Sequence, residues 1–151
     1  MELLIQRIYF GIDRLPRYAD PIPYSTLPEN GIYLFFETGE TVEVAGHARN
    51  RIVRIGTHRE DGRFRKRIQQ HFGRKRSLGG NKNESVFRKH LGAALMRRVD
   101  KSDPRLPGWL AQMGSSDPRL EEEVSKLLRD RFAFCCFRVD DREERVALKL
   151  A

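Results

Sequence analysis

Two short runs of β-forming residues most constrain the fold of this chain. GIYLFF occupies residues 31–36 and RIVRI occupies residues 51–55, and runs of β-branched and aromatic residues are typical of strands. The polar segment between them offers Gly39 and Gly46 as turn points. The pattern predicts an antiparallel strand pair joined by a long polar connection. Arg54 interrupts the second run, although a guanidinium is costly to bury without a partner.

A helix is predicted soon after these two strands. Phe64, Ile68 and Phe72 recur every four residues and define a single apolar stripe. Arg67 and His71 are also four residues apart, one position behind the stripe, so both are expected at its margin, half buried and half exposed. The basic, glycine-rich stretch GRKRSLGGNKN that follows is predicted to be a mobile loop.

Two further helices, a third strand and a last helix are predicted in the remainder of the chain. The first of these helices runs from about residue 84 to residue 97. Its inward face is predicted to hold Val86, Phe87, Leu91, Ala94 and Leu95, and its outward face Arg88, Lys89, Arg97 and Arg98. Asp117 and Pro118 suit the cap and first position of the next helix, which continues to about residue 130. FAFCCFRV predicts the third strand, and DDREERVALK begins the last helix.

The chain is therefore predicted to be one α+β domain, with a small three-stranded antiparallel sheet flanked by helices. Its 151 residues fit a single domain. Residues 1–30 contain four prolines and are expected to form a strand or short helix followed by an irregular lead-in, while residues 31–148 form the core. Cys135 and Cys136 are adjacent, so we expect two buried, reduced residues. No cysteine and histidine set has zinc spacing, which excludes a zinc finger.

The charge of the chain indicates a polyanionic partner. The formal net charge is +8 and the pI is about 9.9, and an excess of Lys and Arg favours nucleic acid because phosphate contacts release counterions. An anionic membrane surface is the second candidate, although no segment approaches the ~18 apolar residues of a spanning helix. The start MELLIQRIYFGID lacks the features of a secretory signal. We therefore expect a cytoplasmic protein.

Three elements in this order resemble the GIY-YIG nuclease domain: GIY at 31–33, RIG at 54–56 on the neighbouring strand, and a helix with Arg67-x-x-x-His71. That family includes the incision subunit of bacterial excision repair, intron-encoded homing endonucleases and some restriction enzymes. The resemblance spans roughly residues 29–149. The segments RIVRIGTHR, RFRKRIQQHF and GGNKNESVFRKHLGAAL resemble an uncharacterised bacterial branch of the superfamily.

The resemblance implies a DNA endonuclease that hydrolyses phosphodiester bonds with Mg²⁺ or Mn²⁺. It assigns Tyr33 to positioning or deprotonating the attacking water, and Arg67 to stabilising the phosphate. His71 would orient the water or contact a phosphate oxygen. Each residue also has a structural interpretation. Tyr33 could be an ordinary strand tyrosine with its hydroxyl at the surface, and Arg67 and His71 could be the wet edge of an amphipathic helix. His47, His58 and His90 are expected to be solvated or packing residues.

Arg54 stands where the second family motif usually has its first tyrosine. If the two strands pair, Arg54 can face the same surface as Tyr33 and Arg67. Our hypothesis is that Arg54 contacts the scissile phosphate and lowers the phenol pKa of Tyr33 by proximity. The alternative is an arginine on the solvent face of the strand, or one paired with a nearby carboxylate.

A second departure concerns the metal ligand. The resemblance implies a glutamate on the last helix, and EERVALKLA places Lys149 at its position. An ammonium has no lone pair to offer a metal ion. The final KLA, residues 149–151, is typical of a vector-encoded tail, and on that interpretation this chain is a truncated, inactive nuclease. Glu143 or Glu144 could substitute, although one helix turn of ~5.4 Å is a large displacement for a metal ligand.

Double-stranded DNA is the expected substrate, and cationic residues near the first helix are the expected contacts. The predicted backbone-binding residues are Arg74, Lys75, Arg76, Lys82, Arg88 and Lys89. A run of charges can also be a merely solvated face. The alternative function is a non-catalytic nucleic-acid-binding module on the same scaffold.

Overall fold

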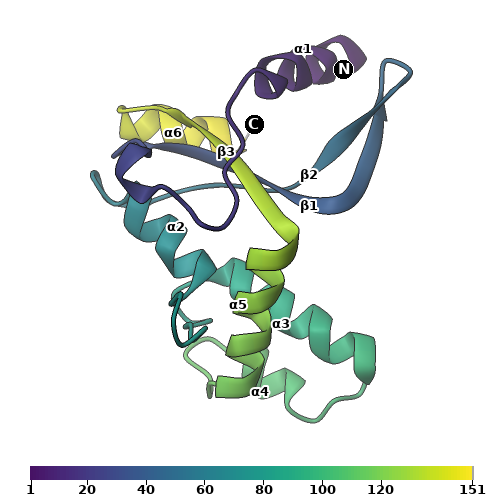
Figure 1. Cartoon of the computed structure of the whole chain (residues 1–151), viewed down its shortest axis with the longest axis vertical. Helices are drawn as coiled ribbons and strands as arrows, with labels where there is room; N and C mark the ends of the chain where they lie inside the picture. The colour runs from purple at the N-terminus through teal and green to yellow at the C-terminus, as the bar shows by residue number, and fades with distance from the viewer. Residues whose placement is uncertain (151) are drawn as a thin grey trace. The chain divides into compact units, whose positions relative to one another are not determined.

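The computed structural model describes residues 1–150, which form a three-stranded antiparallel sheet and six α-helices (Figure 1). The predicted α+β fold class is confirmed. In chain order the elements are α1 (Glu2–Asp13), the 3₁₀ helix η1 (Tyr24–Thr26), β1 (Gly31–Val44), β2 (His47–Thr57), α2 (Phe64–Phe72), α3 (Val86–Val99), α4 (Leu106–Leu110), α5 (Pro118–Arg131), β3 (Phe132–Arg138) and α6 (Arg142–Leu150). Of the two forms predicted for the N-terminal element, the short helix is confirmed.

β1 is the central strand of the sheet, whose order is β2-β1-β3. It pairs antiparallel with β2, with Tyr33 opposite Gly56 and Phe35 opposite Arg54, so the predicted strand pair is confirmed. On its other side β1 pairs antiparallel with β3, where Phe35 lies opposite Phe134. The two motif segments therefore lie on neighbouring strands of one sheet.

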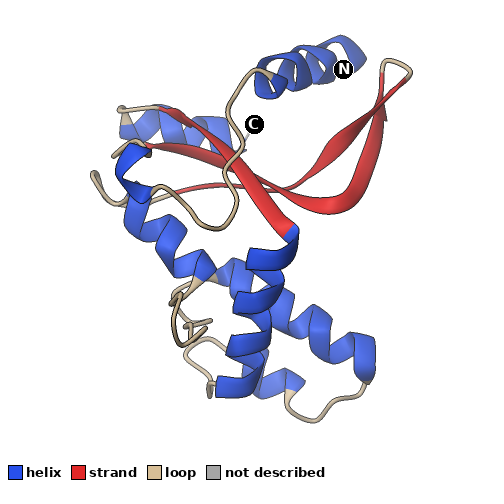
Figure 2. Cartoon of the chain, viewed as in Figure 1, coloured by secondary structure: helices blue, strands red, loops and turns tan. Residues whose placement is uncertain are grey.

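The predicted long connection between the first two strands is wrong. Residues 37–50 extend both strands into a ribbon, which Figure 2 shows continuing past the end of β3. The turn is formed by Ala45 and Gly46, with φ values of 52° and 75°. Two successive residues with positive φ match the twist of a two-stranded ribbon, so a tight hairpin replaces the expected loop.

The sheet has two faces because successive side chains of a strand alternate. One face carries Ile32, Leu34 and Phe36 of β1, which form an apolar core cluster with Ile12 of α1 and Cys135 of β3. The alternate residues of β1, including Tyr33, point to the opposite face. The N-terminal helix thus helps cover the face that does not carry the motif tyrosine.

The chain divides into two compact units. The sheet unit comprises Met1–Arg67 and the residues from Arg131 onward, and the helical unit comprises Ile68–Asp130. The helical unit has a core of its own, formed by Ala93, Met96, Trp109 and Leu120. Its helix α4 was not predicted, since the two prolines and the glycine of SDPRLPGWL are typical of irregular structure. Pro107 instead lies in the first turn of α4, where proline is tolerated.

The predicted faces of α3 are partly wrong. Val86 and Ala94, expected to face inward, are exposed, and Arg88, expected to face outward, is fully buried. The reason is a carboxylate partner, Glu121 of α5, which accepts hydrogen bonds from the guanidinium. Periodicity alone cannot anticipate a polar residue that is buried by pairing.

Two other predictions are confirmed by the described residues. Cys135 and Cys136 are buried and unbridged, and burial raises the pKa of the Cys136 thiol to about 12. Asp117 caps α5, since its Oδ1 accepts from the backbone N–H of Arg119 at 3.1 Å and of Leu120 at 3.2 Å. Within residues 1–150, no helix has both the length and the apolar character needed to cross a membrane.

Candidate active site

The tyrosine of the first motif lies directly on the glycine of the second. A Cβ atom added at Gly56 would lie 2.2 Å from the Tyr33 hydroxyl and 2.4 Å from its Cζ, far closer than van der Waals contact. The Tyr33 ring also lies 5.6 Å from the Phe35 ring and 6.1 Å from the Phe64 ring, measured between centroids. Glycine is therefore required at position 56 because the phenol occupies the space of a side chain.

The glycine of GIY is held by two hydrogen bonds and lies close to β3. Its N–H donates to Nε2 of His58 at 3.2 Å, and its carbonyl accepts from the Thr57 hydroxyl at 2.7 Å. A Cβ at Gly31 would lie 2.4 Å from the Phe137 carbonyl oxygen. The backbone before Tyr33 is thus fixed to the end of β2 and closely approached by β3.

His58 is a buried histidine whose tautomer follows from its partners. Its Nε2 accepts from Gly31, so its Nδ1 carries the proton and donates to the Glu60 carbonyl oxygen at 2.6 Å. Burial lowers the pKa of this imidazole, and the Arg145 charge lowers it further, against the hydrogen bond to Glu60 and the charge of Asp61. Of the two predicted interpretations for His58, the packing one holds.

Both predicted arginines of the sheet unit retain part of their exposed surface. Arg54 is opposite Phe35 in the ladder, two residues from Gly56, so it shares the sheet face of Tyr33. Arg67 lies three residues after Phe64 on α2, which places it beside the residue that packs on the Tyr33 ring. Both side chains are half-buried. The sheet register therefore puts Tyr33 and Arg54 on one face, and Arg67 follows on the helix whose Phe64 packs on Tyr33.

Comparison of the chain with known protein families shows which family it belongs to. A family model described as GIY-YIG domain matches residues 4–149. The chain belongs to the GIY-YIG domain family. Proteins of this family are generally nucleases, which act on nucleic acid and typically use divalent metal ions. No curated protein and no solved structure matches the chain.

The burial of the GIY-YIG tyrosine differs from the expected site. Tyr33 has no exposed surface, so the interpretation as a strand tyrosine with its hydroxyl at the surface is wrong. A water molecule can reach the Tyr33 hydroxyl only when the covering side chains move. Arg54 and Arg67, in contrast, are half-buried and keep part of their surface exposed.

His71 does not lie at a half-exposed helix margin, and that prediction is wrong. The side chain is fully buried, and its Nδ1 lies 2.8 Å from the Ser85 hydroxyl. Its ring packs edge to face with Phe87, with 5.8 Å between the ring centroids. Ser85 is the N-cap of α3, whose hydroxyl accepts from the Arg88 N–H at 3.2 Å. His71 is thus tied to the start of α3, which explains its burial.

The six residues predicted to contact DNA fall into two groups. Arg74, Lys75 and Arg76 are exposed and Lys89 is half-buried, whereas Lys82 and Arg88 are fully buried. The Lys82 ammonium donates to the Asn83 side chain at 3.0 Å and lies 5.4 Å from the centre of the Trp109 ring. Burial lowers the pKa of Lys82, with a further lowering from Lys89. The predicted DNA contact is wrong for Lys82 and Arg88, because both side chains are buried and held by contacts inside the helical unit.

The described residues do not supply a metal site. Between residues 1 and 150, no group of three or more His, Cys, Asp or Glu side chains could hold a metal ion. Lys149 is exposed in the last turn of α6, and an ammonium cannot coordinate a cation. The fallback ligand Glu144 is an exposed residue whose N–H donates to Asp141 at 2.7 Å. The chemistry of these residues therefore does not fit the metal that the family typically uses.

α6 carries a buried arginine, Arg145, one turn before Lys149. The sequence did not predict a role for this arginine. Arg145 donates from Nη1 to the Val139 carbonyl at 3.0 Å and the Asp140 carbonyl at 2.7 Å, and from Nη2 to Asp61 at 2.5 Å. Asp61 lies between β2 and α2. The sequence signal for Arg145 is weak: it is a basic residue four positions before Lys149, a spacing that puts both on one side of a helix.

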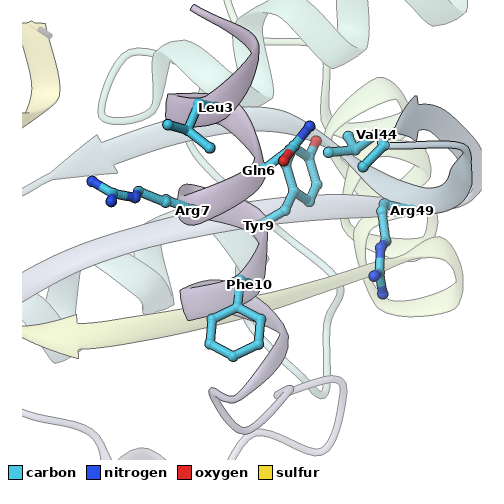
Figure 3. Close-up of a pocket in the computed structure, with 8 residues that line it drawn as sticks. Leu3, Gln6, Arg7, Tyr9, Phe10, Val44 and Arg49 are labelled. Carbon is cyan, nitrogen blue, oxygen red and sulfur yellow. The ribbon is translucent and has the colours of Figure 1, made fainter.

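A surface pocket of the sheet unit lies apart from these residues. It is lined by Leu3, Gln6, Arg7, Tyr9 and Phe10 of α1 and by Val44, Ala45 and Arg49 at the ribbon tip (Figure 3). The Tyr9 hydroxyl accepts a hydrogen bond from the Ile52 N–H at 3.3 Å. None of the motif residues lines this pocket, so it is not part of the candidate active site.

Proposed function

We propose that this GIY-YIG domain cleaves phosphodiester bonds of double-stranded DNA as an endonuclease, with Mg²⁺ or Mn²⁺, when a carboxylate occupies position 149. The observation that carries the proposal is the contact between Tyr33 and Gly56, with Arg54 on the same sheet face. This contact explains why both motifs occur on adjacent strands. With Lys149 in place, the chain itself is proposed to be inactive.

The roles of the residues follow from their exposure. Arg54 and Arg67 contact the scissile phosphate, since guanidiniums bind phosphate oxygens through paired hydrogen bonds. They stabilise the negative charge that develops during hydrolysis. Tyr33 positions the attacking water once its hydroxyl is uncovered. His71 is not included, because its burial and its contact with Ser85 assign it to the structure of the helical unit.

The test is nicking of supercoiled plasmid with Mg²⁺ or Mn²⁺ by the chain and its Lys149→Glu variant. We expect nicking by Lys149→Glu alone, with Lys149→Gln as the control that removes the positive charge without adding a ligand. In the Lys149→Glu background, Tyr33→Phe keeps the ring over Gly56 and removes the hydroxyl, so lost nicking isolates that hydroxyl.

Arg54 is tested in the same background. Removing a group that stabilises the transition state costs roughly 10²–10³ in rate, and we expect a loss of that size for Arg54→Ala. Arg54→Tyr, which restores the usual family residue, should retain more activity. Equal rates for the two variants would remove Arg54 from the proposed mechanism.

Lys149 also favours a second candidate function, a nucleic-acid-binding module without catalysis. A protein of this kind retains the cationic surface and lacks the metal ligand. DNA binding by Lys149→Glu without nicking would support the module and contradict the nuclease. If Lys149→Glu neither binds nor nicks DNA, that result contradicts both the nuclease and the binding module.

A further inference from the structure

The helical unit presents three consecutive cations on one short loop. Arg74, Lys75 and Arg76 are exposed within residues 73–80, here named the cationic loop. None of the three makes an ion pair with a carboxylate among the described residues. The three positive charges are therefore accessible to a partner from outside the chain.

Hydrogen bonds close the cationic loop and hold the chain that enters it. The Arg74 N–H donates to the Gly79 carbonyl at 2.7 Å, which joins the two ends of the loop. Just before the loop, the Arg88 Nη1 donates to the His71 carbonyl at 3.0 Å. The Arg129 Nη2 donates to the Phe72 carbonyl at 3.3 Å and to the Gly73 carbonyl at 3.0 Å. The entry to the loop is thus fixed by two guanidiniums, where the sequence predicted a mobile segment.

A buried ion pair fixes the chain that leaves the loop. Arg88 donates from Nε and Nη2 to Glu121 Oε2, at 2.8 and 2.6 Å, and from Nη2 to the Ser125 hydroxyl at 2.9 Å. The other carboxylate oxygen of Glu121 accepts from the Lys82 backbone N–H at 2.6 Å. The Arg88–Glu121 pair therefore connects the segment before the loop to the segment after it.

Glycines let the loop lie against this pair. A Cβ at Gly80 would lie 2.1 Å from Cζ of Arg88, and one at Gly73 would lie 2.6 Å from the Ser125 hydroxyl. Gly73 also has a φ of +71°, a conformation that most side chains disfavour. The backbone of the loop is thus packed directly on the buried guanidinium, while its three cationic side chains are exposed.

The aromatic residues of the helical unit indicate which form of nucleic acid fits. Phe72, Phe87 and Trp109 are all the Phe, Tyr and Trp residues between positions 68 and 130, and all three are buried. Single-strand binding proteins combine cations with exposed aromatic rings on which bases stack. This surface has cations without such rings, so it suits the backbone of a duplex.

We propose that the cationic loop is a preorganised binding site for backbone phosphates of duplex DNA, held in place by the buried Arg88–Glu121 pair. The proposal rests on the proposed function, since it names the surface that holds the substrate. It predicts binding without base readout, because cations on a loop contact phosphates and carry no sequence information. Preorganisation reduces the entropy lost when the loop binds.

The experiment measures the affinity of the full chain for a short DNA duplex over a series of salt concentrations. Each phosphate contact contributes ~0.9 to the slope of log affinity against log salt, so the triple variant Arg74→Gln, Lys75→Gln, Arg76→Gln should lower the slope by about 2 to 3. At ~0.1 M salt this corresponds to a loss of affinity of about a hundredfold to a thousandfold. A single strand of the same sequence should bind more weakly than the duplex to the unaltered chain.

A matched control separates the loop from net charge. The triple variant Arg97→Gln, Arg98→Gln, Lys101→Gln also removes three exposed positive charges of the helical unit and should change the slope far less. Equal losses in the two triple variants would overturn the proposal, and tighter binding of the single strand would overturn the duplex assignment. A chain that binds no DNA contradicts the proposed function itself, whereas binding that the loop variant leaves unchanged contradicts only this inference.

The anchoring is tested with the cations left intact. Gly80→Ala places a methyl group against the Arg88 guanidinium, whereas at Gly79 the nearest atom to an added Cβ is the Ser77 hydroxyl at 3.3 Å. We expect weaker duplex binding, by about tenfold, for Gly80→Ala and little change for Gly79→Ala. Circular dichroism checks that each variant is folded. If Gly80→Ala does not fold, Ser125→Ala, which removes one acceptor of Arg88, replaces it. A folded anchoring variant with unaltered affinity would overturn the role of the pair.

Discussion

Arg54 of the sheet unit and Arg88 of the helical unit each place a guanidinium in an apolar pattern, but the two side chains differ in burial. Arg54 stays half-buried beside Phe35 in the ladder. Arg88 is fully buried, paired with a carboxylate 33 residues away in the sequence. Burial lowers the pKa of Arg88, against the hydrogen bond to Glu121. The comparison teaches that two guanidiniums in similar apolar patterns can differ in burial, since Arg54 keeps exposed surface and Arg88 keeps none.

The two regions also use glycine in the same way for different purposes. Gly56 makes room for the Tyr33 phenol, and Gly80 makes room for the Arg88 guanidinium. Beside Tyr33 the half-buried Arg54 keeps part of its surface exposed. Around Arg88 the guanidinium is enclosed by acceptors of the chain itself. The first contact lies in the candidate active site, and the second packs a loop against a buried guanidinium.

The largest expected effect comes from breaking the buried pair. Glu121→Gln preserves the shape of the side chain and leaves Arg88 without its counter-charge, and removing one partner of a buried pair typically costs about 3–5 kcal/mol. Urea unfolding followed by circular dichroism measures this loss. We expect a loss of unfolding free energy in that range. The cationic loop should be the part of the chain most affected.

The double variant Arg88→Met, Glu121→Leu is the control for this prediction. Replacing both partners with apolar residues of similar size is often neutral or stabilising, so it should recover most of the stability lost in Glu121→Gln. A Glu121→Gln variant that loses less than about 1 kcal/mol would place the pair among exposed ion pairs and contradict the comparison with Arg54.

Much of the fold could be predicted because it follows local patterns. The strand runs at 31–36 and 51–55, the third strand and the caps of α5 are encoded by neighbouring residues. The ribbon of residues 37–50 was missed because its polar composition is typical of a loop. Its turn depends on Ala45 adopting a positive φ of 52°, which alanine rarely does, so the local signal was weak.

The site could be predicted only where the residues belong to the motif. Tyr33, Arg54 and Arg67 were located by their order along the chain, and the sheet register puts the first two on one face. The partners that bury His71 and Arg88 are 14 and 33 residues away. Such pairings depend on packing of helices against one another, and no periodic pattern of one segment reveals them.

A second, smaller effect is expected at Gly56. Gly56→Ala puts a methyl group in the space of the Tyr33 ring, and overpacking of this kind typically costs about 1–3 kcal/mol. Gly11→Ala is the matched control, since nothing lies within 4 Å of a Cβ at this helical glycine. Alanine there should be stabilising, by up to ~1 kcal/mol. Unfolding in urea measures both variants.

A double-mutant cycle sharpens this prediction. Tyr33→Leu removes the ring that collides with the new methyl group, so the cost of Gly56→Ala should shrink when it is introduced in that background. Additive losses would show that the phenol does not lie on Gly56, and the candidate active site would lose the contact on which it is built.

The smallest expected effect is a pH dependence from His58, which ties the GIY backbone to the end of β2. Burial lowers the pKa of this imidazole in the folded chain, so the unfolded chain, with a histidine pKa of ~6.5, binds the proton more readily. The unfolding free energy should therefore fall as the pH drops below about 6.5, by at most ~1.4 kcal/mol per pH unit, until the folded pKa is passed. Protonation of Nε2 would also remove the acceptor of the Gly31 N–H. His58→Gln should lose this part of the pH dependence, and His90→Gln, at an exposed histidine, should keep it. Identical pH profiles in the unaltered chain and His58→Gln would show that His58 does not hold the motif backbone.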